Sequence, residues 1–167
     1  MRGKGDDAAM DEASDRMQEA ARLAADYAAA HYFVSVGHRE WLFGVGQCAA
    51  DIERELGGSR YLFITAWNPA SDTTPVEANL AADERLQARL KASGCEYHSA
   101  LGSNAQGGAV EYGWVVVDAA EETGDAWARE FGQAGTLSWR RGEAVRLRML
   151  RPRPAGADDG VHTDWVG

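Results

Sequence analysis

The residues of this sequence best suited to chemistry are amides, hydroxyls and one carboxylate that stand where apolar segments begin or end. Amides donate and accept hydrogen bonds, and a carboxylate beside a core needs a hydrogen-bond donor or a chemical role. The residues that we expect to bind a ligand are Asn68, Ser71, Asn79, Glu111 and Gln133. Among them Glu111 is the candidate general base.

Other kinds of catalytic chemistry have little support in the sequence. The four histidines are scattered, so they form neither a nucleophile–base pair nor the spacing of a metal site. Gly44 and Gly46 precede a helical segment, but they match neither a Walker loop nor a full dinucleotide fingerprint. We therefore expect no metal and no cofactor.

The stretch that must position most of the candidate residues is 61–79, YLFITAWNPASDTTPVEAN. It opens with aromatic and β-branched residues that end at Asn68-Pro69, which predicts a buried strand running into a turn. Thr74-Pro75 followed by Glu77 then matches a capping box with proline at the first helical position. The helix that starts here is expected to end at Gly94.

The remaining elements follow from apolar periodicity and turn residues. The last strand alternates apolar residues with Arg146 and Arg148, so we expect it to lie at a sheet edge. We expect helices at 8–30, 47–56, 75–93 and 121–131, and strands at 31–36, 41–45, 61–67, 95–101, 111–118, 136–140 and 144–150.

This order of elements predicts an α+β fold. From residue 61 it reads β-α-β-β-α-β plus one hairpin strand, the order of a ferredoxin-like (split βαβ) antiparallel sheet with two helices on one face. An N-terminal helix and hairpin are added to it, and the two most apolar strands should be adjacent at its centre. We expect a disordered segment at 1–7, a single domain at 8–151 with its core at 60–150 and the helix 8–30 as an accessory, and a flexible tail at 152–167.

In that topology the candidate residues converge although they are distant in sequence. The predicted strand and helix ends that carry them reach one pole of the sheet, where Ser103 and Asn104 join them. Asn79 falls in the core-facing stripe of its helix, so we predict that it is buried and hydrogen-bonded to residues 66–71 or 111. Structural roles remain open as well, because Asn68 can hold a turn, and Asn79 and Gln133 can satisfy buried backbone groups.

A second candidate surface is an aromatic stripe on the sheet. Alternation puts Tyr61, Phe63 and Trp67 on one side of their strand, and we expect Tyr112 and Trp114 to continue the stripe on the neighbouring strand. RNA-recognition domains stack bases on such stripes. The N-terminal helix and hairpin can instead cover it, which we favour because the chain is acidic.

Composition favours a soluble protein with a core of its own. The 167 residues are 45% hydrophobic and carry a formal net charge of −9, which argues against a broad phosphate-binding surface and so against nucleic acid. No apolar run approaches the roughly 20 residues that cross a bilayer, so we expect no membrane partner. Cys48 and Cys95 follow no signal peptide, which favours reduced core thiols in a cytoplasmic protein.

Several of these motifs together resemble domain-of-unknown-function family 3293, a small and mainly bacterial group. The likeness extends over residues 32–150. It rests on TAWNP at 65–69 and FGQ at 131–133, with Glu77–Asn79 at a helix start, Gly94 before a strand and Glu111 before a β-run. The resemblance implies no particular activity.

Three functions are compatible with the sequence. We expect a binding or regulatory module that recognises a small molecule or a protein at the polar pole, because amides and a carboxylate gather there without a catalytic pair. The alternative is a hydrolase or transferase in which Glu111 is the general base and Asn68 or Gln133 orients the substrate. RNA binding on the aromatic face is the third.

Overall fold

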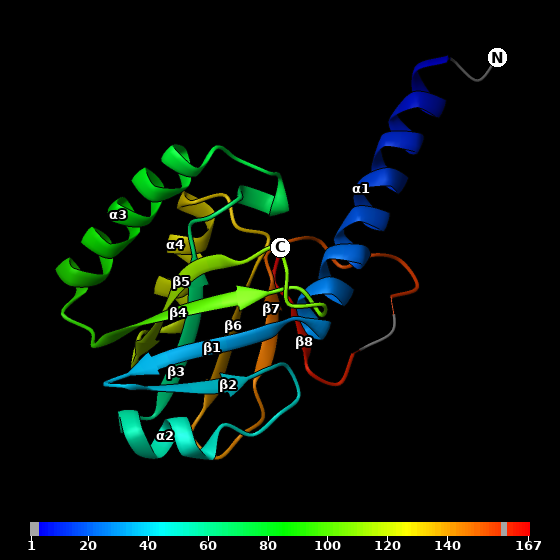
Figure 1. The fold of residues 1–167 in the computed structure, drawn as a ribbon. Helices are drawn as coiled ribbons and strands as arrows, with labels where there is room; N and C mark the ends of the chain where they lie inside the picture. Colours follow the sequence, from blue (N-terminus) through cyan, green and yellow to red (C-terminus); the bar gives the residue numbers. More distant parts are fainter. Residues whose placement is uncertain (1–3, 158–159) are drawn as a thin grey trace.

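The chain folds around one curled sheet whose most apolar strands lie at its centre (Figure 1). The computed structural model describes residues 4–157 and 160–167. Its helices are α1 (Lys4–Ala29), α2 (Ala50–Leu56), α3 (Val76–Ser93) and α4 (Glu121–Glu130), with a 3-10 turn at Pro69–Ser71. Its strands are β1 (His31–Val36), β2 (Arg39–Phe43), β3 (Arg60–Thr65), β4 (Tyr97–Ser103), β5 (Glu111–Val117), β6 (Gly135–Arg140), β7 (Arg146–Met149) and β8 (Thr163–Trp165).

The strand order confirms the predicted centre of the sheet. Across the described residues the order is β2-β1-β4-β5-β3-β6-β7-β8, and every pair is antiparallel except β7 with β8. β3 and β5 are adjacent and antiparallel, with Phe63 opposite Val115. The α+β class is therefore confirmed, and the sheet is larger than expected because the N-terminal hairpin joins it beside β4.

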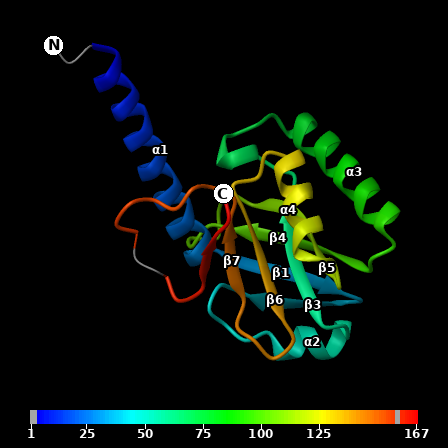
Figure 2. The same ribbon diagram turned by 180° about the vertical axis from the view of Figure 1, so that it is seen from behind.

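Both central helices cover the same face of the sheet, as Figure 2 shows from behind. Alternate residues of β3, such as Leu62 and Ile64, face this side and pack with Leu86 of α3 and Trp127 of α4. The apolar stripe that repeats every 3.6 residues on each helix thus packs on the apolar face that repeats every two residues along the strand, and both are removed from water.

On the opposite face, the curled sheet encloses a second apolar core. Tyr61 and Phe63 of β3 are 2% and 5% exposed, and they pack with Phe43 of the hairpin and with Leu23 of α1. The prediction that the N-terminal helix and hairpin cover this face is confirmed. Coverage removes the rings of Tyr61 and Phe63 from the surface that base stacking would need.

The predicted continuation of the aromatic stripe onto β5 is wrong. Ile64 lies opposite Trp114, and Phe63 lies opposite Val115, so register places Trp114 on the helix face. There its indole nitrogen donates to Asp83 Oδ1 of α3 at 2.9 Å. The predicted alternation of side chains along each strand is correct, but only the pairing register decides which residues of two strands share a face.

The capping box predicted for α3 is not formed. The helix begins at Val76, one residue later than expected, and neither Thr74 nor Glu77 makes a side-chain capping bond within the described chain. Thr74 instead donates its backbone N–H to Asn68 Oδ1 at 2.9 Å. A side chain from the preceding loop thus takes over the donor that the box was expected to satisfy.

Both termini differ from expectation. α1 begins at Lys4, so part of the segment expected to be disordered is helical, and residues 1–3 lie outside the described residues. The tail returns to the sheet as β8, which pairs in parallel with β7. β7 is therefore not the edge strand that its alternating arginines predicted.

Candidate functional site

Asn68 is the centre of a hydrogen-bond network that joins three segments of the chain. Its side-chain nitrogen donates to Glu111 Oε1 at the start of β5, at 3.0 Å. Its side-chain oxygen accepts from Asn79 Nδ2 of α3 at 2.9 Å, and its own backbone N–H donates to Asn79 Oδ1 at 2.9 Å. Asn79 is 2% exposed, so its predicted burial and partner are both confirmed.

The loop that carries Asn68 and Ser71 has an unusual backbone. Asn68, Ala70 and Ser71 all have positive φ angles, of 42°, 55° and 64°. Side chains other than glycine adopt this region at a cost, so the surrounding structure must hold the loop in place. The paired amides of Asn68 and Asn79 supply that support.

The FGQ segment after α4 closes the other side of this loop. Gly132 has a φ of 67°, and a Cβ atom there would lie 3.1 Å from Pro69 Cβ, so glycine is needed for the close approach. The turn delivers Gln133, whose Nε2 donates to the backbone oxygen of Trp67 at 3.1 Å. Gln133 is 5% exposed and therefore serves a buried backbone group, one of the two roles that the sequence left open.

A cavity of about 610 Å³ opens beside this network. Asn68, Ser71, Glu111 and Gln133 line it, together with Ser103 and Asn104 from the end of β4 and the following loop. The structure thus brings the predicted pole together, and Asn79 supports it from behind without lining the cavity. An apolar floor comes from Phe63 and Leu137.

Glu111 is the half-buried carboxylate of the cavity. Burial raises the pKa of Glu111 above its ordinary value of 4.5, whereas the hydrogen bond from Asn68 lowers it, and the rise prevails. One carboxylate oxygen accepts from Asn68. The group is therefore held in place on one side and is free to meet a ligand on the other.

Two tyrosines complete the wall and were missed by the sequence analysis. Tyr27, in the last turn of α1, shares a hydrogen bond of 2.8 Å with the Ser71 hydroxyl, and Tyr32 of β1 donates to the backbone oxygen of Tyr27 at 2.9 Å. Burial raises the pKa of both phenols. Tyr27 stood in the apolar stripe of the N-terminal helix, a signal for burial that says nothing of a cavity.

The charges that line the cavity have one sign. Asp26 and Glu111 line it, and the described lining includes neither lysine nor arginine. Arg151, which does not line the cavity, acts to lower the pKa of Tyr27, although burial raises it overall. A neutral or cationic ligand group therefore suits this cavity better than an anion.

Other candidate features of the sequence find no site here. No group of three or more histidine, cysteine, aspartate or glutamate side chains within 4–157 and 160–167 is placed to hold a metal ion. Both cysteines are free; the expectation of a core thiol is wrong for the exposed Cys48, whereas the half-buried Cys95 packs against the core. None of the described helices is long and apolar enough to cross a membrane.

Comparison with known proteins confirms the family resemblance over a shorter segment than the 32–150 expected from the sequence. Residues 64–135 match the family described as Protein of unknown function (DUF3293), so the chain resembles that family across β3 to β6. The matched segment contains Asn68, Asn79, Glu111 and Gln133 but neither Tyr27 nor Tyr32. No curated protein matches the chain, and no solved structure matches it.

Proposed function

We propose that this protein is a small-molecule binding module whose ligand enters the cavity between α1, β4 and the loop that follows β3. The observation that carries the proposal is the cavity itself, of about 610 Å³, into which polar residues from four separate segments converge. Ligand sites typically measure roughly 300–1,000 Å³ and combine an apolar lining with a few placed polar groups.

The chemistry of the lining narrows the class of ligand. Glu111 offers a carboxylate oxygen, Ser71 and Tyr27 offer hydroxyls, and Phe63 offers an aromatic surface. A ligand with an amine or another hydrogen-bond donor on an apolar frame would satisfy these groups. An anionic ligand would face Glu111 and Asp26 without a lining cation.

Strain at the cavity also supports a binding role. The positive φ angles at Asn68, Ala70 and Ser71 lie in the loop that forms one wall. Unfavourable backbone angles concentrate at ligand clamps, where they fix groups before the ligand arrives. Asn68 and Asn79 act as positioning residues here, because their amides hold the loop rather than point into open space.

Native mass spectrometry of freshly purified protein, combined with a thermal-shift panel of amines, tests the proposal. A bound amine should raise Tm, and Glu111→Gln should weaken its binding by about tenfold, or about 1.4 kcal/mol. Glu77→Gln is the matched control, because Glu77 is exposed on α3 and outside the cavity. If no amine binds, or if the two variants bind alike, the proposed class of ligand is wrong.

A hydrolase or transferase with Glu111 as general base is the second candidate, and the raised pKa of Glu111 favours it. A base with a pKa nearer neutrality transfers protons more effectively at physiological pH. Asn68 and Gln133 each donate one of their two amide hydrogens within the chain, so the second hydrogen of either remains to orient a substrate, beside the paired hydroxyls of Ser71 and Tyr27. Equal turnover by wild type and Glu111→Gln in an activity screen would remove Glu111 from such a mechanism.

Two further properties belong to the same proposal. The order β4-β5-β3-β6, with α3 and α4 on one face, supports a ferredoxin-like (split βαβ) origin for the centre of the sheet. The two free cysteines and the acidic composition support a cytoplasmic location. If cell fractionation recovers the native protein in a fraction other than the cytoplasm, the proposed cytoplasmic location is wrong.

A further inference from the structure

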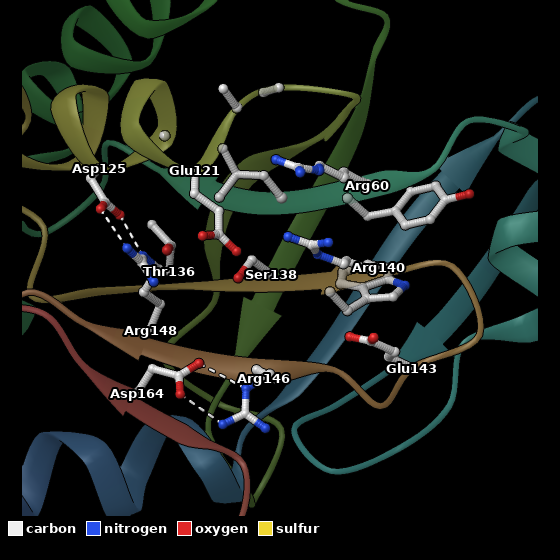
Figure 3. A pocket seen from close by; sticks show the side chains of 16 residues that line it. Arg60, Glu121, Asp125, Thr136, Ser138, Arg140, Glu143, Arg146, Arg148 and Asp164 are labelled. Atoms are coloured by element: carbon white, nitrogen blue, oxygen red, sulfur yellow. Dashed lines mark hydrogen bonds and ion pairs between the residues drawn. The ribbon is translucent and has the colours of Figure 1, made fainter.

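The helix-bearing face of the sheet becomes polar where α4 no longer covers it. Strand alternation puts the apolar residues of β6 and β7, such as Leu137 and Leu147, on the opposite face. The side chains left on this face form a small pocket that Figure 3 shows from close by. Its polar residues on β3, β6 and β7 are Arg60, Thr136, Ser138, Arg140, Arg146 and Arg148.

Two of the four arginines are already neutralised. Arg148 donates two hydrogen bonds to Asp125 of α4, at 2.7 and 2.8 Å. Arg146 donates two to Asp164 of β8, both at 2.7 Å. Paired bonds of this kind hold the guanidinium plane in one orientation and use its charge within the protein.

The other two arginines have no such partner. Arg60 of β3 and Arg140 of β6 are directly opposite each other in the strand register. Neither side chain makes an ion pair or a hydrogen bond in the part of the chain that the structure describes. Figure 3 shows both guanidinium groups extending in the same direction, with that of Arg140 pointing toward Glu121 and Ser138. Like charges opposite each other on paired strands are destabilising, so a counter-ion would stabilise this pair.

A buried hydroxyl in the same pocket also lacks a partner. Thr136 is 2% exposed, and its Oγ1 has no hydrogen-bond partner among the described residues. Figure 3 places its side chain beside the Arg148–Asp125 pair, at one end of the pocket. The pocket has a volume of about 60 Å³. That is several times the roughly 10–15 Å³ that one water needs, so a small polar group fits.

We propose that this pocket binds the phosphate group of a small ligand, held between Arg60 and Arg140 and facing the Ser138 hydroxyl. Guanidinium groups present planar forks that match phosphate oxygens, and a phosphate has enough oxygens to serve both arginines and a hydroxyl at once. A carboxylate has only two. The small volume admits the phosphate alone, so the rest of the ligand would extend into solvent.

Two exposed carboxylates limit the affinity of this site. Glu121 of α4 and Glu143 of the β6–β7 turn line the same pocket, and neither forms an ion pair within the described residues. Their charges oppose an anion, and with Asp125 and Asp164 they balance the four arginines. The net charge of −9 also disfavours a long polyanion, so we infer a compact phosphate ester rather than nucleic acid.

Titration of the full-length protein with inorganic phosphate at low ionic strength, followed by NMR of the arginine side chains and by Tm, tests the site. Phosphate should bind in the millimolar range and raise Tm by mass action. Arg60→Gln/Arg140→Gln should weaken binding at least tenfold. Arg39→Gln/Arg85→Gln should leave it unchanged, because it removes the same charge from two exposed positions elsewhere. Glu121→Gln should tighten it.

The opposite results would overturn the proposal. Equal binding by both double variants would show a general charge effect, and equal binding of acetate and phosphate would rule out a phosphate site. Absence of binding to wild type would mean that Glu121 and Glu143 merely neutralise the arginines. The test does not depend on the proposed amine cavity, whose lining contains neither Arg60 nor Arg140.

Discussion

At the scale of single residues, Asn79 matters because it is a polar side chain in the apolar stripe of α3. It donates from Nδ2 to Asn68 Oδ1 and to the backbone oxygen of Thr74, at 2.9 and 3.2 Å, and its Oδ1 accepts from the Asn68 N–H. An amide is the one kind of side chain of this size that can do all three. The left-handed loop around Asn68 therefore depends on a residue of the following helix.

Replacing Asn79 with leucine should destabilise the protein. The change keeps the size of the side chain but leaves the Asn68 N–H without its acceptor, so we expect a loss of about 1–3 kcal/mol in the free energy of unfolding. Gln87→Leu, an amide-to-leucine change at an exposed position of the same helix, is the control. Urea denaturation of both variants checks this, and a loss no larger than the control's would contradict the network.

Glu111 should make stability depend on pH. Because burial raises its folded pKa, the folded protein binds the proton more tightly than the unfolded chain does. The stability that Glu111 contributes therefore falls as the pH rises from 4.5, the ordinary pKa of the group, through the raised pKa of the folded state. The loss is complete above that folded pKa. Glu111→Gln keeps an oxygen for Asn68 but cannot ionise.

We expect Glu111→Gln to be more stable than wild type at neutral pH and to lose that advantage in acid, below the ordinary glutamate value. Unfolding free energies measured across this window give the difference curve, and groups that titrate alike in both proteins cancel from it. Gln87→Leu, which replaces an exposed side chain that does not titrate, should show no such curve. A difference independent of pH would mean that Glu111 is solvated.

At the scale of elements, the Arg148–Asp125 pair ties α4 to β7. The side chains are 19% and 10% exposed, unlike the Arg54–Asp51 pair of α2 at 70% and 61%. The helix and strand are joined by two charged hydrogen bonds, because α4 covers β3 and leaves the outer strands without an apolar partner on this face.

Asp125→Ala should therefore cost much more stability than Asp51→Ala. Removing one partner of a fully buried pair costs about 3–5 kcal/mol, so we expect about 2–3 kcal/mol for this partly shielded one. The exposed pair should contribute about 0–1 kcal/mol. Thermal unfolding of the two variants compares them, and similar losses of Tm would show that the pair does not fasten α4.

At the scale of the whole molecule, α1 has an exposed N-terminal arm, residues 5–19, and a buried C-terminal part, residues 20–29. Figure 1 shows the helix extending away from the sheet. From Gly5 to Glu19 only Ala13 is even half-buried, whereas Ala20, Leu23 and Ala24 belong to the core. Only the last turns of α1 thus contribute to packing, and they deliver Tyr27 to the cavity.

Removing residues 1–18 should change the free energy of unfolding by no more than about 0.5 kcal/mol, because it removes exposed side chains. Removing residues 1–29 should cost about 2–5 kcal/mol or more, because Leu23 leaves a hole in the core. Chemical denaturation of the two truncated proteins checks this. A large loss in the shorter truncation, or a change in its oligomeric state, would show that the arm packs against a partner.

The sequence by itself determined the order of elements from α1 to β7, the central pairing of β3 with β5, and the burial of Asn79. These follow from local signals: β-branched runs, glycine and proline at the turns, and the angle of a side chain around a helix. It also brought Asn68, Ser71, Glu111 and Gln133 to one pole, because the order β-α-β-β-α-β leaves few ways to arrange the ends of its elements.

Only the tertiary structure decided which neighbours those residues meet. Trp114 lies on the face opposite to the predicted one, because the register between two strands depends on both strands and is not encoded by either alone. Asn68 replaced the capping box because the turn of the preceding loop brings its side-chain oxygen back to the Thr74 N–H. Tyr27, Tyr32 and the Arg60–Arg140 pair came together through contacts across distant positions, and such contacts are fixed by the closing of the sheet rather than by the local chain.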